Sequence, residues 1–296
     1  MKTQRKILRD THVQGEILPE MDEPQFRQWV DLIEERTGIV FPPTRKSFLI
    51  TNLVIRMKEI GCATYQEYFE QIKCGVNGLK EWTILANRIA MQEARFFSHA
   101  SSLELVKEIA ESKLPGEDGS VNVQAWSVAC STGEEAYTLA IVIDQALSSR
   151  SEPGHFGITA TDICQAALVY GREGFYKGKR INDINNAHLQ QYFEEAEDGQ
   201  YKVCDRLRQQ VCFTRMNIEE IDHEQVGKMD IIYCQNLLTY FDRERREEIV
   251  NNMVEHLHPG GLLILGSGEL SGWKHPLMEK ASCNHTLAYK RRNADN

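Results

Sequence analysis

Apolar residues recur at helical spacing through the first hundred residues of the chain. Runs of apolar residues three or four positions apart predict four helices, over residues 23–38, 43–60, 65–73 and 79–94. Gly38 and Gly61 suit the ends of the first two helices. Residues 1–20 lack this period, and we expect a flexible tail there. Residues 21–100 are therefore predicted to form a small all-helical domain that ends in a linker helix.

Strand-like and helix-like runs alternate in the rest of the chain. After a helix over residues 102–112, strands are predicted at 121–130, 157–161, 211–215, 230–234 and 262–266. Helices are predicted between them at 134–147, 165–170 and 243–256, and a turn at Pro259-Gly260-Gly261. This order is typical of an α/β fold with a doubly wound, mostly parallel, Rossmann-like sheet, here over residues 101–296.

One stretch interrupts the alternation. Residues 171–213 are rich in Gly, Lys, Asn and mixed polar residues. A small β insertion over residues 178–213 and a disordered loop are both open explanations.

Composition narrows the class of protein. Hydrophobic residues make up 42% and charged residues 26% of the 296, which is typical of globular chains and excludes disordered or collagen-like ones. The net charge of −9 disfavours nucleic-acid binding by the whole protein. No apolar run approaches the length of a membrane span, and the eight cysteines form no C-x-x-C pair. We expect a soluble, cytoplasmic protein whose cysteines are reduced and buried.

The charge is unevenly distributed along the chain. Residues 1–100 hold 14 Lys and Arg against 13 Asp and Glu, so the excess of acidic residues lies in residues 101–296. Residues 41–58 contain four basic residues and no acidic one: Arg45, Lys46, Arg56 and Lys58. Arg45 and Arg56 stand eleven positions apart and share one helix face. This basic patch is predicted to bind an acidic partner.

The first predicted strand leads into a turn of small residues, Ala129-Cys130-Ser131-Thr132-Gly133, followed by Glu134-Glu135. Such a turn lets backbone N–H groups approach a ligand, and the acids can hold a cationic amino group. The alternative is a helix cap, with Ser131 as N-cap and Glu134 as its capping-box partner. The composition alone leaves these two interpretations about even.

Two more strand ends carry candidate ligand-binding residues. Asp162 ends the second strand, where an acid holds a ribose diol in dinucleotide-type sheets, although it also suits the N-cap of the next helix. The run from Gln235 to Phe241 places amides and aromatics after a buried strand. Asn236 can hydrogen-bond a ligand and Tyr240 can line the site, or the aromatics can be core residues.

Together these stretches resemble the CheR-type chemotaxis protein methyltransferases, which use S-adenosylmethionine to methylate receptor glutamates. The resemblance covers roughly residues 22–290 and keeps the order of the parts. The matching runs are Phe96-Phe97, Trp126-Ser-x-x-x-Ser-Thr-Gly-Glu-Glu, Thr161-Asp162-Ile163, Asn217, Cys234-x-Asn236-x-x-x-Tyr240-Phe241, Pro259-x-Gly261 and Gly268-Glu269. The length, the acidity and the tail are similar to the PilK-like branch of type IV pilus chemosensory systems.

The resemblance implies a role for each matching residue. Glu135 would hold the methionyl amino group of the cofactor, Asp162 the ribose, and Tyr240 would lie beside the transferred methyl group. The other residues implied to contact the cofactor are Gln92, Ala94, Ser98, Thr132, Gly133, Asn217, Ile218, Gln235 and Asn236. The partner would be the cytoplasmic helices of a methyl-accepting chemoreceptor, the product S-adenosylhomocysteine, and the enzyme a monomer without a metal.

The linker departs from the family pattern Asn-x-Thr-x-Phe-Phe-Arg. This chain has Ala94 in place of the threonine and Ser98 in place of the arginine that meets the cofactor's carboxylate. Losing such a charge-assisted contact removes about 1.5–3 kcal/mol of binding free energy. Arg95 and His99 are the candidates to replace it, so we place Arg95 and Ser98 with Tyr240 in the catalytic site.

The proposed chemistry needs neither a general base nor a metal. A glutamate carboxylate has a pKa of about 4.3 and is already an ionised nucleophile at pH 7. His256 and His258, two positions apart, do not share a helix face and do not suggest a metal site. A weakened, cofactor-binding regulatory module remains the alternative function. A methyltransferase acting on small molecules or nucleic acids is disfavoured by the helical domain and the acidity.

Overall fold

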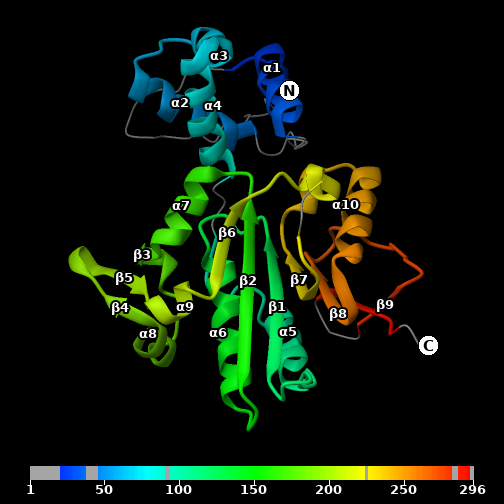
Figure 1. The fold of residues 1–296 in the computed structure, drawn as a ribbon. Coiled ribbons are helices and arrows are strands. Elements are labelled where there is room, and N and C mark those ends of the chain that lie inside the picture. The colour runs from blue at the N-terminus through cyan, green and yellow to red at the C-terminus, as the bar shows by residue number, and fades with distance from the viewer. Residues whose placement is uncertain (1–20, 38–45, 91–93, 224–225, 282–285, 294–296) are drawn as a thin grey trace, which may run out of the picture. The chain divides into compact units, whose positions relative to one another are not determined.

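The structure is a computed structural model that describes residues 21–37, 46–90, 94–223, 226–281 and 286–293 (Figure 1). Its described residues divide into two compact units. The helical unit contains residues 21–36 and 46–89, and the sheet unit runs from Ala90 onward. The expected tail, Arg45 and Gln92 lie outside the described residues.

The helical unit consists of α1 (Glu23–Thr37), α2 (Lys46–Ile60), α3 (Tyr65–Lys73) and α4 (Gly75–Ala90). Trp29 of α1 packs against the rings of Tyr68 and Phe69 of α3, with ring centroids 5.3 and 5.1 Å apart. The Thr64 side chain accepts the Glu67 N–H and thereby caps α3. Burial of one apolar stripe from each helix explains why helical spacing predicted this unit well.

The sheet unit has a seven-stranded sheet in the order β6-β2-β1-β7-β8-β10-β9. The first five strands are parallel: β6 (Val211–Arg215), β2 (Gly154–Asp162), β1 (Val121–Val128), β7 (Met229–Cys234) and β8 (Leu257–Leu265). The last two, β10 (Leu287–Arg291) and β9 (Met278–Lys280), are antiparallel. The chain leaves β1 in one direction for β2 and β6 and then crosses to β7, so a topological switch point lies between β1 and β7. The predicted doubly wound fold is confirmed.

Helices cover both faces of this sheet (Figure 1). One face packs against α5 (Ala100–Ser112), α6 (Glu134–Ser148) and α7 (Gln165–Glu173). The other face packs against α10 (Arg243–Glu255) and the short helix η4 (Ile218–His223). From Ala125 to Val128, the central strand β1 is buried on both faces, as expected for a strand in a parallel sheet.

A three-stranded antiparallel sheet follows α7, in the order β3-β5-β4. Its strands are β3 (Phe175–Lys177), β4 (Phe193–Glu195) and β5 (Gln200–Val203). Between and after them lie η2 (Gly178–Arg180), α8 (Asn186–Tyr192), η3 (Glu197–Gly199) and α9 (Asp205–Arg208). We call residues 175–208 the β insertion. The disordered-loop alternative is wrong, and the insertion begins before residue 178.

Three local expectations are wrong. Pro259-Gly260-Gly261 lies within β8, where the pairing register with β7 shifts, and Gly260 has a φ of +79°. Strand β10 was not predicted, because residues 287–291 form a short run with little alternation. Cys74 and Cys212 are exposed rather than buried.

Within the described residues, no helix is long and apolar enough to cross a membrane. No group of three or more His, Cys, Asp and Glu side chains suited to a metal ion occurs in the same residues.

Candidate active site

Three chain segments meet at the switch point, at the carboxyl ends of adjacent strands. Val128 at the end of β1 pairs with Thr161 of β2 on one side and with Cys234 of β7 on the other. The segments that follow these residues are the β1–α6 turn (Ala129–Gly133), Asp162, and the loop after β7 (Gln235–Tyr240). The structure therefore brings together the three stretches that the sequence singled out.

The β1–α6 turn has an unusual backbone. Ala129 and Ser131 have φ values of +58° and +49°, and Gly133 has +93°. Left-handed conformations cost non-glycine residues about 1–2 kcal/mol each, and such strain concentrates at functional sites. A Cβ at Gly133 would stand 2.9 Å from the Phe213 ring, so glycine is required there.

Asp162 braces this turn from the neighbouring strand. Its carboxylate accepts the Ser131 N–H and the Cys164 N–H, each at 2.8 Å. Burial raises the pKa of Asp162, while these backbone N–H groups act in the opposite direction. A carboxylate has about four acceptor positions, so Asp162 keeps capacity for further hydroxyl donors.

The helix-cap alternative for Ser131 is wrong. The N-cap of α6 is Gly133, and no side chain caps this helix end. The Ser131 hydroxyl is buried and has no hydrogen-bond partner among the described residues. An unsatisfied buried hydroxyl costs about 1–3 kcal/mol, which fits a site completed by a polar ligand.

Glu135 follows the turn, and its carboxylate lacks a cationic partner among the described residues. Its carboxylate accepts a 2.6 Å hydrogen bond from the Ser127 hydroxyl. Burial and the nearby Glu269 carboxylate raise the pKa of Glu135 to about 8. No lysine or arginine among the described residues forms an ion pair with it. A bound ammonium group would supply the missing charge, so the residues of this site fit S-adenosylmethionine.

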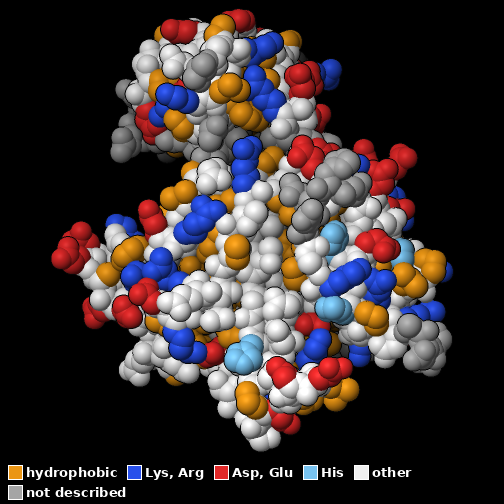
Figure 2. All heavy atoms as spheres, in the orientation of Figure 1, with side chains coloured by type: hydrophobic (Ala, Val, Ile, Leu, Met, Phe, Trp, Pro, Cys, Tyr) orange, Lys and Arg blue, Asp and Glu red, His pale blue; other side chains and the backbone are white. Residues whose placement is uncertain are grey.

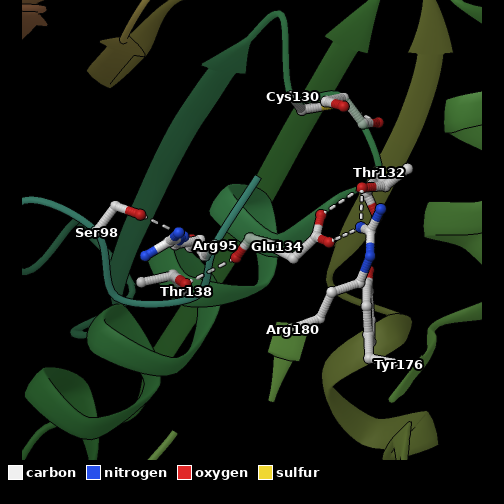
Figure 3. A network of polar contacts seen from close by, with 9 residues as sticks. Arg95, Ser98, Cys130, Thr132, Glu134, Thr138, Tyr176 and Arg180 are labelled. Carbon is white, nitrogen blue, oxygen red and sulfur yellow. Dashed lines mark hydrogen bonds and ion pairs between the residues drawn. The ribbon is translucent and has the colours of Figure 1, made fainter. Parts of the chain in front are cut away.

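Thr132 is held by structural contacts. Its hydroxyl donates to Glu134 at 2.6 Å and accepts from Arg180 at 2.7 Å, and its carbonyl accepts from Tyr176 at 2.7 Å (Figure 3). The sequence did not indicate Arg180 or Tyr176, because both come from the β insertion more than 40 residues later.

The residues after β7 and β6 are placed at the same edge. Gln235 is buried and donates to the Leu265 carbonyl of β8, whereas Asn236 is exposed with a φ of +61°. Tyr240 is half-buried at the end of η5 (Leu238–Tyr240). Asn217 is half-buried, and its side chain accepts the Glu219 N–H. Ile218 is buried in the apolar cluster under the β1 end.

The linker residues do not lie on a helix, contrary to expectation. Helix α4 ends at Ala90, and residues 94–99 form an irregular segment of the sheet unit. The segment is attached to α6, because the Phe97 N–H donates to the Thr138 hydroxyl at 3.1 Å. Phe97 and His99 have positive φ values, which are incompatible with a continuous helix.

Ala94, Arg95 and Ser98 lie close to the start of α6 through this attachment. The Ser98 hydroxyl donates to the Arg95 carbonyl at 3.0 Å (Figure 3). The Arg95 side chain is exposed, and Ser98 is half-buried. The role of Ser98 in the site stays a prediction.

The basic patch of the helical unit is not free of acidic neighbours. Arg56 binds Glu81, with Nε 2.9 Å from the carboxylate, and also Glu59, and hydrogen bonding to Glu81 raises its pKa. Lys46 pairs with Glu23 at 3.0 Å, while Lys58 is exposed. Basic, acidic and apolar side chains lie next to one another on the face of this unit seen in Figure 2. The window of residues 41–58 could not show this, since Glu23 and Glu81 lie on other helices and Glu59 follows the window on α2.

Comparison with known families agrees with this geometry. The model of the CheR methyltransferase SAM binding domain matches residues 92–286, and that of the CheR methyltransferase all-alpha domain matches residues 24–90. The chain is 30% identical over 249 residues to chemotaxis protein methyltransferase 2 of Vibrio cholerae, covering 83% of this chain and 85% of that protein. It is also 30% identical over 270 residues to the chemotaxis protein methyltransferase of Salmonella typhimurium, covering 90% and 86%. The chain therefore belongs to the CheR methyltransferase family, as an S-adenosylmethionine-dependent protein-glutamate methyltransferase.

Proposed function

We propose that this methyltransferase modifies glutamates on the cytoplasmic helices of a methyl-accepting chemoreceptor and releases S-adenosylhomocysteine. The observation that carries this proposal is the pair of unmatched polar groups at the switch point. Two such groups lie beside the strained β1–α6 turn: the buried Ser131 hydroxyl, which has no partner among the described residues, and the half-buried Glu135 carboxyl, which has a pKa of about 8. Both features suit a ligand with a cationic amino group.

The proposed roles of the chain's residues follow from their positions. Bound S-adenosylmethionine supplies an electrophilic methyl group on a sulfonium. Glu135 holds the amino group, and Asp162 accepts hydrogen bonds from the ribose. Tyr240 lies beside the transferred methyl group, where it helps exclude water and align the incoming carboxylate. The remaining proposed contacts are Gln92, Ala94, Ser98, Thr132, Gly133, Asn217, Ile218, Gln235 and Asn236. Arg95 is placed with Ser98 and Tyr240 in the catalytic site.

The receptor glutamate needs no activation by the enzyme. Its carboxylate is ionised at neutral pH and attacks directly once it is aligned with the methyl carbon and the sulfur. Lys58 and Lys46, with Arg45, remain the proposed contacts to an acidic receptor helix. Arg56 is engaged by Glu81 and Lys46 by Glu23, so each would have to exchange its acidic partner to bind a receptor helix.

Several finer points are part of the same proposal. The enzyme acts as a cytoplasmic monomer on a protein substrate rather than on nucleic acid, within a chemosensory system of the type IV pilus class. We assign the helical domain to residues 21–89 and the catalytic domain to residues 90–296, rather than 21–100 and 101–296, because residues 94–99 belong to the sheet unit. These statements rest on the sequence resemblance described above.

The decisive experiment is methyl transfer from labelled S-adenosylmethionine to membranes that contain the cognate receptor. We expect base-labile methyl esters on receptor glutamates. Calorimetry with S-adenosylhomocysteine distinguishes the methyltransferase from the alternative function, a cofactor-binding regulatory module. Binding without transfer to any of several receptors would favour a regulatory module.

Ser98→Arg tests the missing arginine in the same assay. If the linker contact is truly lost, this variant binds S-adenosylhomocysteine at least about tenfold more tightly, the equivalent of about 1.4 kcal/mol. Equal affinities of the wild type and the variant would show that another residue supplies the contact.

A further inference from the structure

Arg180 of the β insertion reaches the turn where the cofactor binds. Its guanidinium forms an ion pair with Glu134 and donates to the Thr132 hydroxyl at 2.7 Å (Figure 3). Glu134 is completely buried, and its other carboxylate oxygen accepts the Thr132 hydroxyl at 2.6 Å. Arg180 also lies over the Tyr170 ring, 5.4 Å from its centroid. The three polar groups thus form one closed cluster.

Tyr176, also of the insertion, completes the hold on this segment. Its hydroxyl donates to the Thr132 carbonyl at 2.7 Å. Thr132 stands between Ser131 and Gly133, which both have left-handed backbones. Two side chains of the insertion therefore fix the residue at the centre of a strained turn, while Asp162 fixes Ser131 from the sheet. A turn that is unfavourable by itself persists because its surroundings determine it.

We propose that Arg180 is a positioning residue that holds the β1–α6 turn in its cofactor-binding conformation. Cofactor binding at the turn is then coupled to attachment of the β insertion to α6. The coupling is reciprocal, so a ligand that steadies the insertion tightens cofactor binding by the same factor as the cofactor steadies the insertion. This inference rests on the proposed cofactor role of the turn.

A buried ion pair is not explained by stability alone. Desolvation of the two charges often offsets their attraction, so well-packed apolar residues would serve as well or better for stability. The arrangement instead gives the Thr132 hydroxyl a fixed partner on each side. This geometric specificity is what a binding turn requires.

A second ion pair between the β insertion and α6 offers a matched control, and it is formed by Arg206. This arginine, also of the insertion, contacts Asp144 of α6 with both nitrogens, at 2.7 and 3.2 Å. The Tyr192 hydroxyl donates to the same carboxylate at 2.9 Å, and Arg206 lies 5.7 Å from the Tyr192 ring centroid. Asp144 is ten residues along α6 from Glu134. Both arginines attach the insertion to α6, but Arg180 alone of these two touches the turn.

The test compares Arg180→Gln and Arg206→Gln in the full chain. We expect Arg180→Gln to weaken S-adenosylhomocysteine binding at least about tenfold, and Arg206→Gln to change it less than about twofold. Both variants lower the thermal midpoint. The double variant Glu134→Gln with Arg180→Gln removes the buried charge. It should still bind S-adenosylhomocysteine weakly, because the Thr132 hydroxyl has lost its hydrogen bond from Arg180.

Hydrogen exchange supplies a readout that does not depend on the cofactor. The Ser131 and Gly133 N–H groups are hydrogen-bonded to Asp162 and to the Cys130 carbonyl. In the unliganded protein, Arg180→Gln should speed exchange of both amides, and Arg206→Gln should leave them unchanged. With S-adenosylhomocysteine, exchange in residues 175–203 should slow in the wild type and in Arg206→Gln but not in Arg180→Gln.

Two results would overturn the proposal. One is unchanged turn exchange in Arg180→Gln, and the other is an equal effect of both substitutions. Wild-type protein that fails to bind S-adenosylhomocysteine while Arg180→Gln still loosens the turn would count against the cofactor role of the turn and would uphold the positioning role.

Discussion

The helical unit and the switch point differ in how their charged side chains are paired. In the helical unit, Arg56 is matched by Glu81 and Glu59, both within ordinary hydrogen-bond distance. At the switch point, Glu135 has a hydroxyl partner but no cation, and the Ser131 hydroxyl has no partner in the described chain. Matched charges stabilise a fold, whereas unmatched ones lower its stability until a ligand arrives. The comparison separates structural from ligand-binding polar groups on physical grounds.

The largest expected effect comes from Glu135→Gln. Loss of a charge-assisted contact to the ligand's amino group costs about 2–3 kcal/mol, or roughly 30- to 150-fold in affinity. Calorimetric titration with S-adenosylhomocysteine measures this loss. Stability should change in the opposite direction, with a higher thermal midpoint for the unliganded variant at pH 9. A variant that binds normally would remove Glu135 from the site.

The second prediction concerns pH. The Glu135 carboxyl, with a pKa of about 8, must lose its proton to meet an ammonium group. Affinity should therefore weaken below pH 8, by at most about tenfold per unit. Because the folded-state pKa is raised, the stability contributed by the neutral carboxyl is present at low pH and lost as pH rises through about 8. Glu135→Gln is the control, and its affinity should be nearly flat between pH 6 and 8.

Arg56→Gln should lower stability and leave cofactor affinity unchanged, whereas Glu135→Gln should lower affinity and raise stability. Breaking the contacts of Arg56 leaves the mostly buried Glu81 without this partner and should destabilise the helical unit by about 1–2 kcal/mol. Denaturant unfolding monitors this loss. Affinity for S-adenosylhomocysteine should stay within twofold of the wild type. Lys80→Gln, at an exposed position of α4, serves as the control and should leave stability nearly unchanged. Tighter or weaker cofactor binding in Arg56→Gln would contradict the separation of roles.

The smallest effect is expected for Ser131→Ala. Removing an unsatisfied buried hydroxyl should stabilise the unliganded protein by about 0.5–1 kcal/mol and weaken S-adenosylhomocysteine about three- to fivefold. Thermal unfolding with and without ligand reports both changes. Thr138→Ala offers a comparison of like size, because the Thr138 hydroxyl bonds both Phe97 and Glu134 and its loss should only destabilise. Equal behaviour of the two variants would argue that Ser131 has no ligand.

Most of the fold was accessible from the sequence because it depends on local periodicity. Strand β7 and the carboxyl halves of β1 and β8 are buried on both faces and appear as apolar runs, and the four amino-terminal helices each keep a 3.6-residue stripe. The turn predicted at Pro259-Gly260-Gly261 is wrong, because a register shift in β8 accommodates a motif that otherwise marks a turn. The helix predicted for the linker is wrong for a related reason. The positive φ values of Phe97 and His99 interrupt the helix, and no local sequence signal indicates them.

The same distinction, between what a local pattern shows and what tertiary packing decides, applies to the candidate site. The three strand ends were found because each carries its own motif beside a strand. Glu81, which binds Arg56, and Arg180, which binds Glu134, were missed because they lie 25 and 46 positions away, on elements whose approach depends on tertiary packing. Glu134 shows the difference well, since the local pattern left a ligand contact and a capping box as equal alternatives, and the fold supplies an arginine as its partner.

The left-handed residues around the site have a consequence for mutational tolerance. Phe97, His99, Ala129, Ser131 and Asn236 come from three separate segments, yet all five have φ values between +49° and +61°. β-Branched side chains fit poorly there whether the position is buried or exposed. A saturation library selected for folded protein should therefore lose Val, Ile and Thr at exposed Asn236 while retaining Gly and Asp, a preference that surface exposure alone would not produce.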